Sequence, residues 1–358
     1  MVILVNSGAK TTVDNGEASH LKDGRAVGIW LAACCLLIFA MIVLGGVTRL
    51  TGSGLSMVDW QPISGVIPPI SATQWEKEFA AYRESPEYLE INRGMDLNAF
   101  KTIFYFEYAH RMLGRFIGIA FLLPFAYFWL RRKINNRDVP RYVIMFILGG
   151  FQGLLGWYMV QSGLVDIPHV SQYRLTAHLA AALFIYGYIL WMAFPLLCPK
   201  RSSLEASSVG GKAMAMMIFI AVTLLSGGFV AGLNAGHAFN TFPLMGGQII
   251  PSGYFSLNPW WKNLFDNIPS VQFNHRYLGI LTYIIVCVFI LSSWKDNILK
   301  YHRWVLSLLL LSVSIQGALG ILTLLLHVPV VIATAHQAVG LVVLTVTLYL
   351  VYLTRSRS

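Results

Sequence analysis

The chain has 358 residues, of which 56% are hydrophobic and only 12% are charged. Soluble domains carry roughly 25% charged residues, so this composition excludes an ordinary soluble fold and indicates an integral membrane protein. The net charge of +10 does not indicate nucleic-acid binding, because the basic residues fall in short segments between apolar runs, where Lys and Arg set membrane topology.

Eight apolar segments are long enough to cross the hydrocarbon layer, which takes about 20 residues. We therefore predict an all-α integral membrane protein with eight transmembrane helices. The predicted spans are 26–48, 103–130, 141–163, 172–197, 212–234, 273–294, 303–326 and 329–354. Residues 1–25 are predicted to be a polar tail, and the apolar run that follows is too long for a signal peptide.

Lys and Arg gather at one end of the predicted spans. The two tails and the segments that join spans two to three, four to five and six to seven hold 16 of the 26 basic residues. Because short cytoplasmic loops are enriched in Lys and Arg, both termini are predicted to be cytoplasmic. The long connections 49–102 and 235–272 then lie on the outer side, where we expect them to cap the bundle.

Four histidines lie in four different apolar segments: His110, His178, His275 and His336. Each follows the outer start of an even-numbered predicted span within about two turns, so the four imidazoles are expected at one level of the bilayer. Ionisable side chains inside a membrane are costly and usually functional. These histidines are therefore candidate ligands.

The surroundings of the histidines repeat along the chain. The matching segments are EYAHR at 107–111 with QFNHR at 272–276, QGLLG at 152–156 with QGALG at 316–320, TAH at 176–178 with TAH at 334–336, and GG at 45–46 with GG at 227–228. We predict two four-helix units in tandem, 26–197 and 212–354. An even number of crossings per unit makes the two units parallel.

Two histidines from different helices of one unit can face each other across the bundle interior, where cofactors are commonly held. Haem iron takes axial imidazoles on opposite faces, so each unit is predicted to hold one haem. Two other readings stay open: neutral imidazoles hydrogen-bonded to neighbouring helices, and a copper or zinc site. Two imidazoles without a thiolate are a poor set for tetrahedral zinc.

Arg111 and Arg276 directly follow two of the histidines. A guanidinium suits a bidentate contact with a carboxylate, so both arginines are candidates for binding haem propionates. The alternative is that each side chain reaches to the lipid headgroups without contacting a ligand.

The two units differ beside their first histidine. Glu107 lies three residues before His110 on the same helical face, whereas the equivalent residue beside His275 is Gln272. A carboxylate can exchange protons and an amide cannot, so we assign chemistry to the N-terminal unit and electron transfer to the C-terminal unit. The alternative for Glu107 is an ion pair with Arg111, four residues later.

Two other kinds of protein fit part of this pattern. A di-haem membrane cytochrome b, linked to quinol, would use two permanent haems only to pass electrons. A transporter would use the parallel repeats for alternating access, but it would be expected to carry charged or helix-breaking residues near the midplane.

Several segments together resemble one known family, the haem A synthases. The resemblance rests on EYAHR at 107–111, GGVTRLTGSGLS at 45–56, YRLTAHL at 173–179 and AGHAFNTFPLM at 235–245. It extends over nearly the whole chain from the first predicted span to the last.

The resemblance implies an oxidoreductase that converts the C8 methyl of haem O to a formyl group, giving haem A for terminal oxidases with water as the source of oxygen. It implies heme b as a cofactor on His275 and His336, haem O as the substrate at His110 and His178, and Glu107 in catalysis. The partners implied are haem O synthase, oxidase assembly factors and an electron acceptor that the sequence does not identify; no nucleic acid is expected.

One feature departs from part of that family. Some bacterial members have a cysteine pair in the first outer loop, and residues 49–102 contain no cysteine. The chain is therefore similar to the branch shared by proteobacteria and mitochondria. Because the N-terminus does not resemble a transit peptide, a bacterial inner membrane is the expected location.

Overall fold

The computed structural model describes residues 8–59, 65–164, 168–199, 209–296 and 298–355, with side chains from residue 24 onward. Within these residues the fold is helical and has no strand, which confirms the all-α prediction. The long helices are α1 (Gly8–Leu50), α4 (Leu97–Leu130), α5 (Val139–Leu164), α6 (Gln172–Leu197), α7 (Gly210–Gly232), α8 (Ile268–Ser293), α9 (Arg303–Leu325) and α10 (Val330–Thr354).

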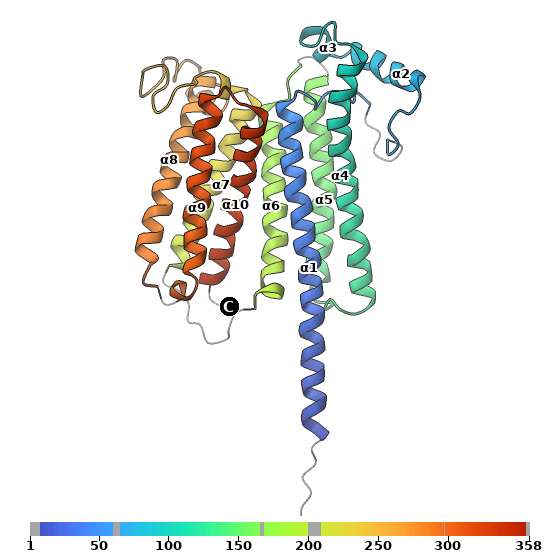
Figure 1. The fold of residues 1–358 in the computed structure, drawn as a ribbon, viewed down its shortest axis with the longest axis vertical. Coiled ribbons are helices and arrows are strands. Elements are labelled where there is room, and N and C mark those ends of the chain that lie inside the picture. The colour runs from blue at the N-terminus through green and yellow to red at the C-terminus, as the bar shows by residue number, and fades with distance from the viewer. Residues whose placement is uncertain (1–7, 60–64, 165–167, 200–208, 297, 356–358) are drawn as a thin grey trace, which may run out of the picture.

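All eight predicted spans are confirmed as helices that are long and apolar enough to cross a membrane. Several ends differ from prediction. Helix α1 begins at Gly8, inside the predicted polar tail, and its 43 residues extend about 65 Å. The N-terminal part of this helix projects beyond the bundle (Figure 1). Helix α4 starts at Leu97 instead of residue 103, because Asp96 caps it by accepting a hydrogen bond from the Ala99 N–H at 2.7 Å.

The outer connections contain short helices. Helices α2 (Ala72–Arg83) and α3 (Pro86–Glu90) follow α1, and the 3₁₀ segments η1 (Ala235–His237) and η2 (Trp260–Leu264) follow α7. A third 3₁₀ segment, η3 (Leu299–Tyr301), lies at the opposite end of the bundle. Helix α2 has a capping box, in which Ser71 and Gln74 each accept a backbone hydrogen bond from the other.

An aromatic cluster holds the first outer connection on α4. Trp75, Phe79 and Tyr82 of α2 pack on Phe100 and Phe104 of α4, and all five side chains are buried. Figure 1 shows α2 and α3 over the end of α4, as the predicted cap requires.

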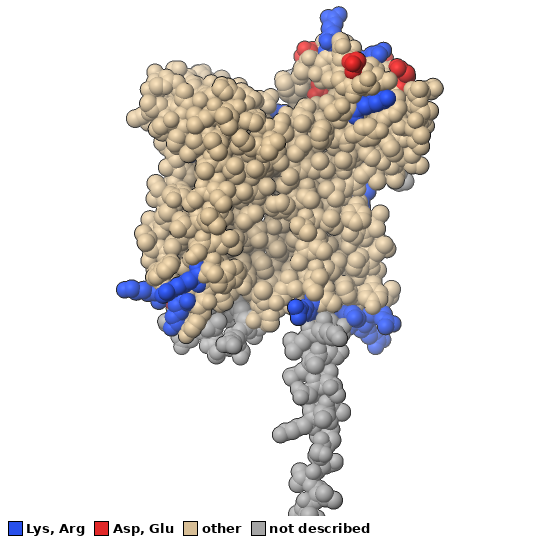
Figure 2. Space-filling view, viewed as in Figure 1, with Lys and Arg blue, Asp and Glu red and all other residues tan. Residues whose placement is uncertain are grey.

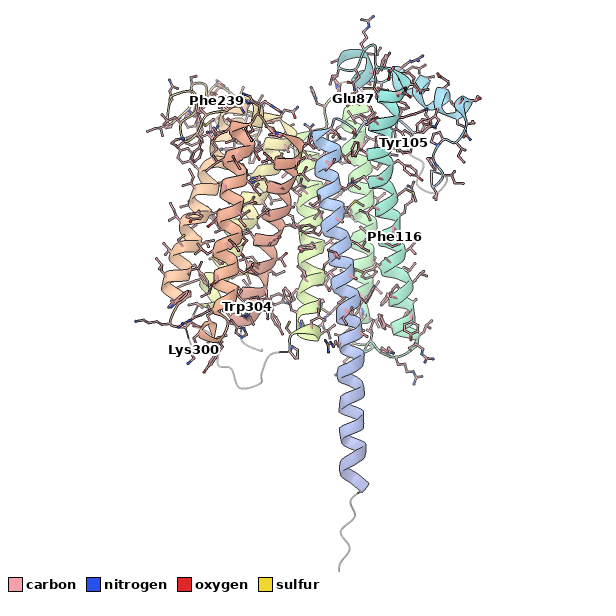
Figure 3. The ribbon with its side chains drawn as sticks, in the orientation of Figure 1. Glu87, Tyr105, Phe116, Phe239, Lys300 and Trp304 are labelled. Atoms are coloured by element: carbon pink, nitrogen blue, oxygen red, sulfur yellow. The ribbon has the colours of Figure 1, made fainter. Side chains whose placement is uncertain are left out.

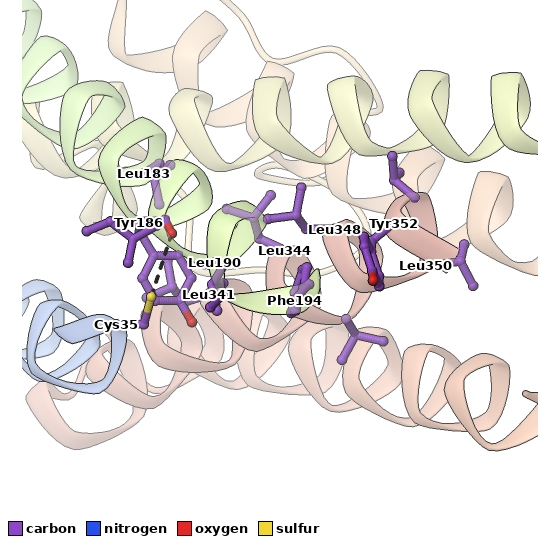
Figure 4. Close-up of a cluster of buried hydrophobic side chains, with 14 of the residues drawn as sticks. Cys35, Leu183, Tyr186, Leu190, Phe194, Leu341, Leu344, Leu348, Leu350 and Tyr352 are labelled. Carbon is purple, nitrogen blue, oxygen red and sulfur yellow. Dashed lines mark hydrogen bonds between the residues drawn. The ribbon is translucent and has the colours of Figure 1, made fainter. Parts of the chain in front are cut away.

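The helix pairings are the same in the two halves of the chain. Helix α1 packs on α4 and α6, and α5 packs on α6; correspondingly, α7 packs on α8 and α10, and α9 packs on α10. The halves meet through α1, α6, α7 and α10. Apolar side chains of all eight long helices form the main core, and Figure 4 shows part of it, with labelled residues from α1, α6 and α10. These pairings are those that a tandem repeat requires, and the repeat itself stays a prediction.

Two glycine pairs sit at this seam in the same way. An added Cβ at Gly46 of α1 would overlap the side chain of Gln337 in α10, and one at Gly228 of α7 would lie 2.9 Å from Oγ1 of Thr176 in α6. Helices approach each other closely where such small residues face a neighbour. The second glycine of each pair thus contacts the opposite half.

Candidate functional site

Each of the four predicted histidine ligands lies on an even-numbered span. His178 and His336 each lie six residues after the start of their helices, α6 and α10, and His275 lies seven residues after the start of α8. His110 lies thirteen residues into α4, because that helix begins at Leu97, where it packs under α2. All four side chains are half-buried.

The structure brings the C-terminal pair together. The ring centres of His275 and His336 are 6.3 Å apart, and the ring planes are perpendicular. Two imidazoles on opposite sides of one metal ion, each bonded at about 2 Å, have centres roughly 6 Å apart. The separation therefore fits a single ion between the two rings, as axial ligation of haem iron demands.

The N-terminal pair is also close. His110 and His178 are near enough for the charge of one imidazole to act on the other. They come from α4 and α6, which both pack beside α5, so the pair occupies the interior of the first half. The structure thus groups the predicted ligands as the sequence paired them.

Each histidine rests against a glycine of the preceding transmembrane helix. An added Cβ on that glycine would lie within 3.1 Å of the imidazole Cε1 atom in every case. The contacts are Gly45 with His110, Gly156 with His178, Gly227 with His275, and Gly320 with His336. Real Cβ atoms essentially never come as close as at Gly320, and the other three contacts would be tighter than most real Cβ contacts, so glycine is the residue that best admits these ring positions.

Buried polar atoms without a hydrogen-bond partner gather around the same histidines. Within the described part of the chain these atoms include Nδ1 of His110 and His178, and Oε1 of Gln152 and Gln316, whose amide nitrogens lie 3.4 and 3.5 Å from Nε2 of His178 and His336. Buried polar groups are normally paired, and orphaned ones often face an ion or a ligand. Their position beside the imidazoles supports a bound group at each pair.

Glu107 is buried and fully engaged. Its Oε2 accepts hydrogen bonds of 2.8 Å from the Ser56 hydroxyl and the Met57 N–H, and its Oε1 accepts one of 2.6 Å from Arg111. The ion pair that the sequence offered as an alternative role for Glu107 is therefore present. Ser56 ends the segment 45–56 on which the family resemblance rests, but the sequence did not predict that Ser56 or Met57 would bind Glu107, because loop residues far from α4 carry no periodic signal.

The two arginines hold the loops that follow α1 and α7. Arg111 also donates to the carbonyls of Met57 and Asp59, and Arg276 donates to those of Phe239 and Thr241, the latter at 2.5 Å. Figure 3 labels one residue of each of these outer connections, Phe239 after α7 and Glu87 after α1, and both lie at the same end of the bundle. A propionate contact for either arginine stays a prediction.

Gln272 occupies the place of Glu107 in the second half. It is 1% exposed, and its side-chain N–H donates to the Phe239 carbonyl at 3.2 Å. The residue equivalent to the carboxylate therefore keeps the contact with the cap but brings no acid to the C-terminal pair.

These features define a class of protein: a multi-pass helical membrane protein whose interior histidine pairs suit a metalloporphyrin. Residues 28–348 match the COX15-CtaA family, described as cytochrome oxidase assembly protein. The chain is 48% identical to a protein named "Heme A synthase" from Nitrosospira multiformis, over 91% of this chain and 92% of that protein.

Two further relatives carry the same name. The chain is 48% identical to the protein from Nitrosomonas eutropha, over 92% of this chain and 94% of the relative, and 42% identical to that from Rhodospirillum centenum, over 92% and 89%. The chain belongs to the haem A synthase family. Membership of this family favours haem A synthesis over the alternative function, electron transfer by a di-haem membrane cytochrome b.

Proposed function

We propose that this protein oxidises the C8 methyl of haem O to a formyl group and so makes haem A, with water as the source of the oxygen atom. The observation that carries the proposal is the pair of interior histidine sites in a haem A synthase chain, with a carboxylate beside only one of them. Such an oxidation releases electrons and protons, so it needs both an electron carrier and a proton acceptor.

The C-terminal pair suits the electron carrier. His275 and His336 would hold a resident heme b, whose iron supplies one-electron redox chemistry when it is bound. The separation and perpendicular planes of the two rings support this assignment. Arg276 directly follows His275 in the chain and is assigned to a propionate of the same haem.

The N-terminal pair suits the substrate. His110 and His178 would bind the iron of haem O, and Glu107 would take up a proton released as the methyl group is oxidised. The hydrogen bonds from Ser56, Met57 and Arg111 hold the carboxylate in one place, and Arg111 supplies the neighbouring positive charge. Fixed donors of this kind cost no reorganisation during a reaction.

The proposal extends to location and partners. Bacterial relatives with this family name suggest an inner membrane, and the clustered basic residues favour cytoplasmic termini. Haem O synthase, oxidase assembly factors and an electron acceptor are the proposed partners.

Glu107→Gln tests the catalytic role. The amide keeps an oxygen that can accept from Ser56 and Met57 but cannot take up a proton, so we expect normal haem binding and a loss of haem A production by at least about a hundredfold. Haem extraction and chromatography of cells producing the variant measure the product. Glu87→Gln, which alters another buried carboxyl in the cap, is the matched control. Normal haem A output from Glu107→Gln rejects the role.

His275→Ala tests the cofactor site. The variant is expected to lose the low-spin heme b absorption of the purified protein, because only one axial imidazole remains. His302→Ala, at a histidine of the opposite end of the bundle, serves as the control. An unchanged spectrum in His275→Ala moves the cofactor elsewhere.

A further inference from the structure

The two histidine pairs differ in what their second ring nitrogen contacts. In the C-terminal pair, Nδ1 of His275 lies 2.7 Å from the Ser226 hydroxyl, and Nδ1 of His336 lies 3.1 Å from the Gln316 carbonyl oxygen. In the N-terminal pair, Nδ1 of His110 and of His178 is buried and meets no partner within the described residues.

The contacts of the C-terminal pair favour a proton on Nδ1 of each ring. The Gln316 carbonyl oxygen is only an acceptor, so Nδ1 of His336 can meet it only as a donor. The Ser226 hydroxyl lies 2.7 Å from the Thr223 carbonyl oxygen, to which it can donate its single hydrogen, and its oxygen then accepts from Nδ1 of His275. Protonation of Nδ1 leaves the lone pair on Nε2, the atom that would bind iron.

The difference between His275 and His110 is traceable to one sequence position. Ser226 directly precedes Gly227, the glycine that contacts His275, and Leu44 directly precedes Gly45, the glycine that contacts His110. A leucine side chain has no hydrogen-bonding atom, so this register gives His110 no acceptor. The two imidazoles have the same steric setting and different polar settings.

We propose that Ser226 is a positioning residue that fixes His275 as an Nε2 ligand, and that Leu44 in its place lets the N-terminal site release its haem. The inference rests on the proposed function, in which the C-terminal haem is resident and the N-terminal haem passes through. A hydrogen bond to the far nitrogen fixes the tautomer and plane of a metal-bound imidazole, and its loss lowers metal affinity by about 10- to 100-fold.

The experiment uses the purified full-length protein with its resident haem. Ser226→Ala is expected to release that haem to apomyoglobin about tenfold faster or more. Its midpoint potential is expected to shift upward, because Nδ1–H donation makes the ligand more basic and favours ferric iron. Ser226→Thr, which keeps the hydroxyl, is expected to restore both values.

Ser312→Ala is the matched control. This serine is also buried in the second half, but its hydroxyl donates to the Leu309 carbonyl of its own helix. The variant loses one helix hydroxyl without touching a histidine, so its haem transfer rate and potential are expected to equal those of the unaltered protein.

Leu44→Ser is the reciprocal variant. A hydroxyl in the register of Ser226 is expected to slow the transfer of added haem O from the N-terminal site to apomyoglobin by about tenfold. This arm is informative even where Ser226→Ala does not fold. Equal transfer rates in the unaltered protein and Leu44→Ser count against the inference.

The failures of the two proposals are distinguishable. An unaltered protein without any low-spin haem overturns the proposed function. Resident haem whose transfer rate and potential are the same in Ser226→Ala as in the unaltered protein overturns the role of Ser226 alone.

Discussion

At the scale of single residues, a small number of close contacts decide where the imidazoles lie. Gly320 is so close to His336 that a Cβ would lie 2.9 Å from the ring, whereas a Cβ at Gly279 would meet nothing within 4 Å. Gly279 lies in the same helix as His275, four residues after it. The glycines that touch the rings instead come from the preceding helices, because neighbouring helices determine the side-chain environment of each ligand.

Glu87 is the buried carboxyl of the outer cap. Burial raises its pKa from 4.5 to about 7, opposed by the hydrogen bond from Tyr82; the charge of Glu107 adds to the shift and that of Arg49 opposes it. The folded state therefore binds this proton more tightly than the unfolded chain does. The corresponding stability is fully present below pH 4.5 and is lost as the pH rises to about 7.

We expect this shift to contribute about 3 kcal/mol to the difference in unfolding free energy across that pH window. Thermal unfolding in detergent at pH 5 and pH 8 measures it, and Glu87→Gln should remove most of the difference. Glu76→Gln, at an exposed glutamate of α2, is the control. An equal pH dependence in Glu87→Gln and the unaltered protein contradicts the prediction.

At the scale of elements, the C-terminal parts of α1 and α7 each contact two neighbouring helices through a Gly-Gly pair. Gly45 and Gly227 contact the histidines of their own half, and the next residues, Gly46 and Gly228, contact the opposite half. Adjacent residues on a helix point about 100° apart, so a Gly-Gly pair can clear two directions at one level. Arg49 adds a link across the seam by donating to the Ala231 carbonyl at 2.9 Å.

Gly232→Ala tests how tightly α7 packs on α6. An added Cβ at Gly232 would lie 2.6 Å from the Cα of Gln172, and a backbone atom cannot rotate away. We expect the free energy of unfolding of the variant to be about 1–3 kcal/mol lower, which is the usual cost of overpacking, and its melting temperature to fall. Gly150→Ala in α5 meets nothing within 4 Å and should be neutral or slightly stabilising. Equal melting temperatures for the two variants contradict the packing argument.

At the scale of the whole molecule, charge is distributed between the two ends. Figure 2 shows Lys and Arg at both ends of the bundle, whereas the acidic residues visible on this face all lie at the α2–α3 end. The opposite end, called the basic end here, therefore shows Lys and Arg without acidic residues on this face. Lys300, in η3, lies at the basic end (Figure 3). This asymmetry favours a cytoplasmic location for the basic end.

Cysteine labelling tests that orientation. In a Cys198→Ser background, which removes an exposed native thiol, Glu76→Cys in α2 should react with an impermeant maleimide in spheroplasts. Lys300→Cys should react only after the membrane is permeabilised. The reverse pattern places the termini outside.

Much of this protein was determined by the sequence alone. Apolar segments of membrane length predicted the eight spans, since hydrocarbon admits no unpaired backbone groups. The repeated surroundings of His110 and His275 predicted how the four histidines are grouped into two pairs. The N-terminal ends of α1 and α4 were predicted less well, because hydropathy does not show how far a helix extends past its apolar stretch; in α4 the cap at Asp96 sets that end.

Only the tertiary structure decided how the polar groups near the histidines are used. It directed Glu107 and Arg111 to the loop at Ser56 and Met57, and it placed Ser226 against His275. The reason is physical: periodicity along the chain reports which face of a helix is apolar, but a hydrogen bond between helices depends on which neighbour packs there and at what height.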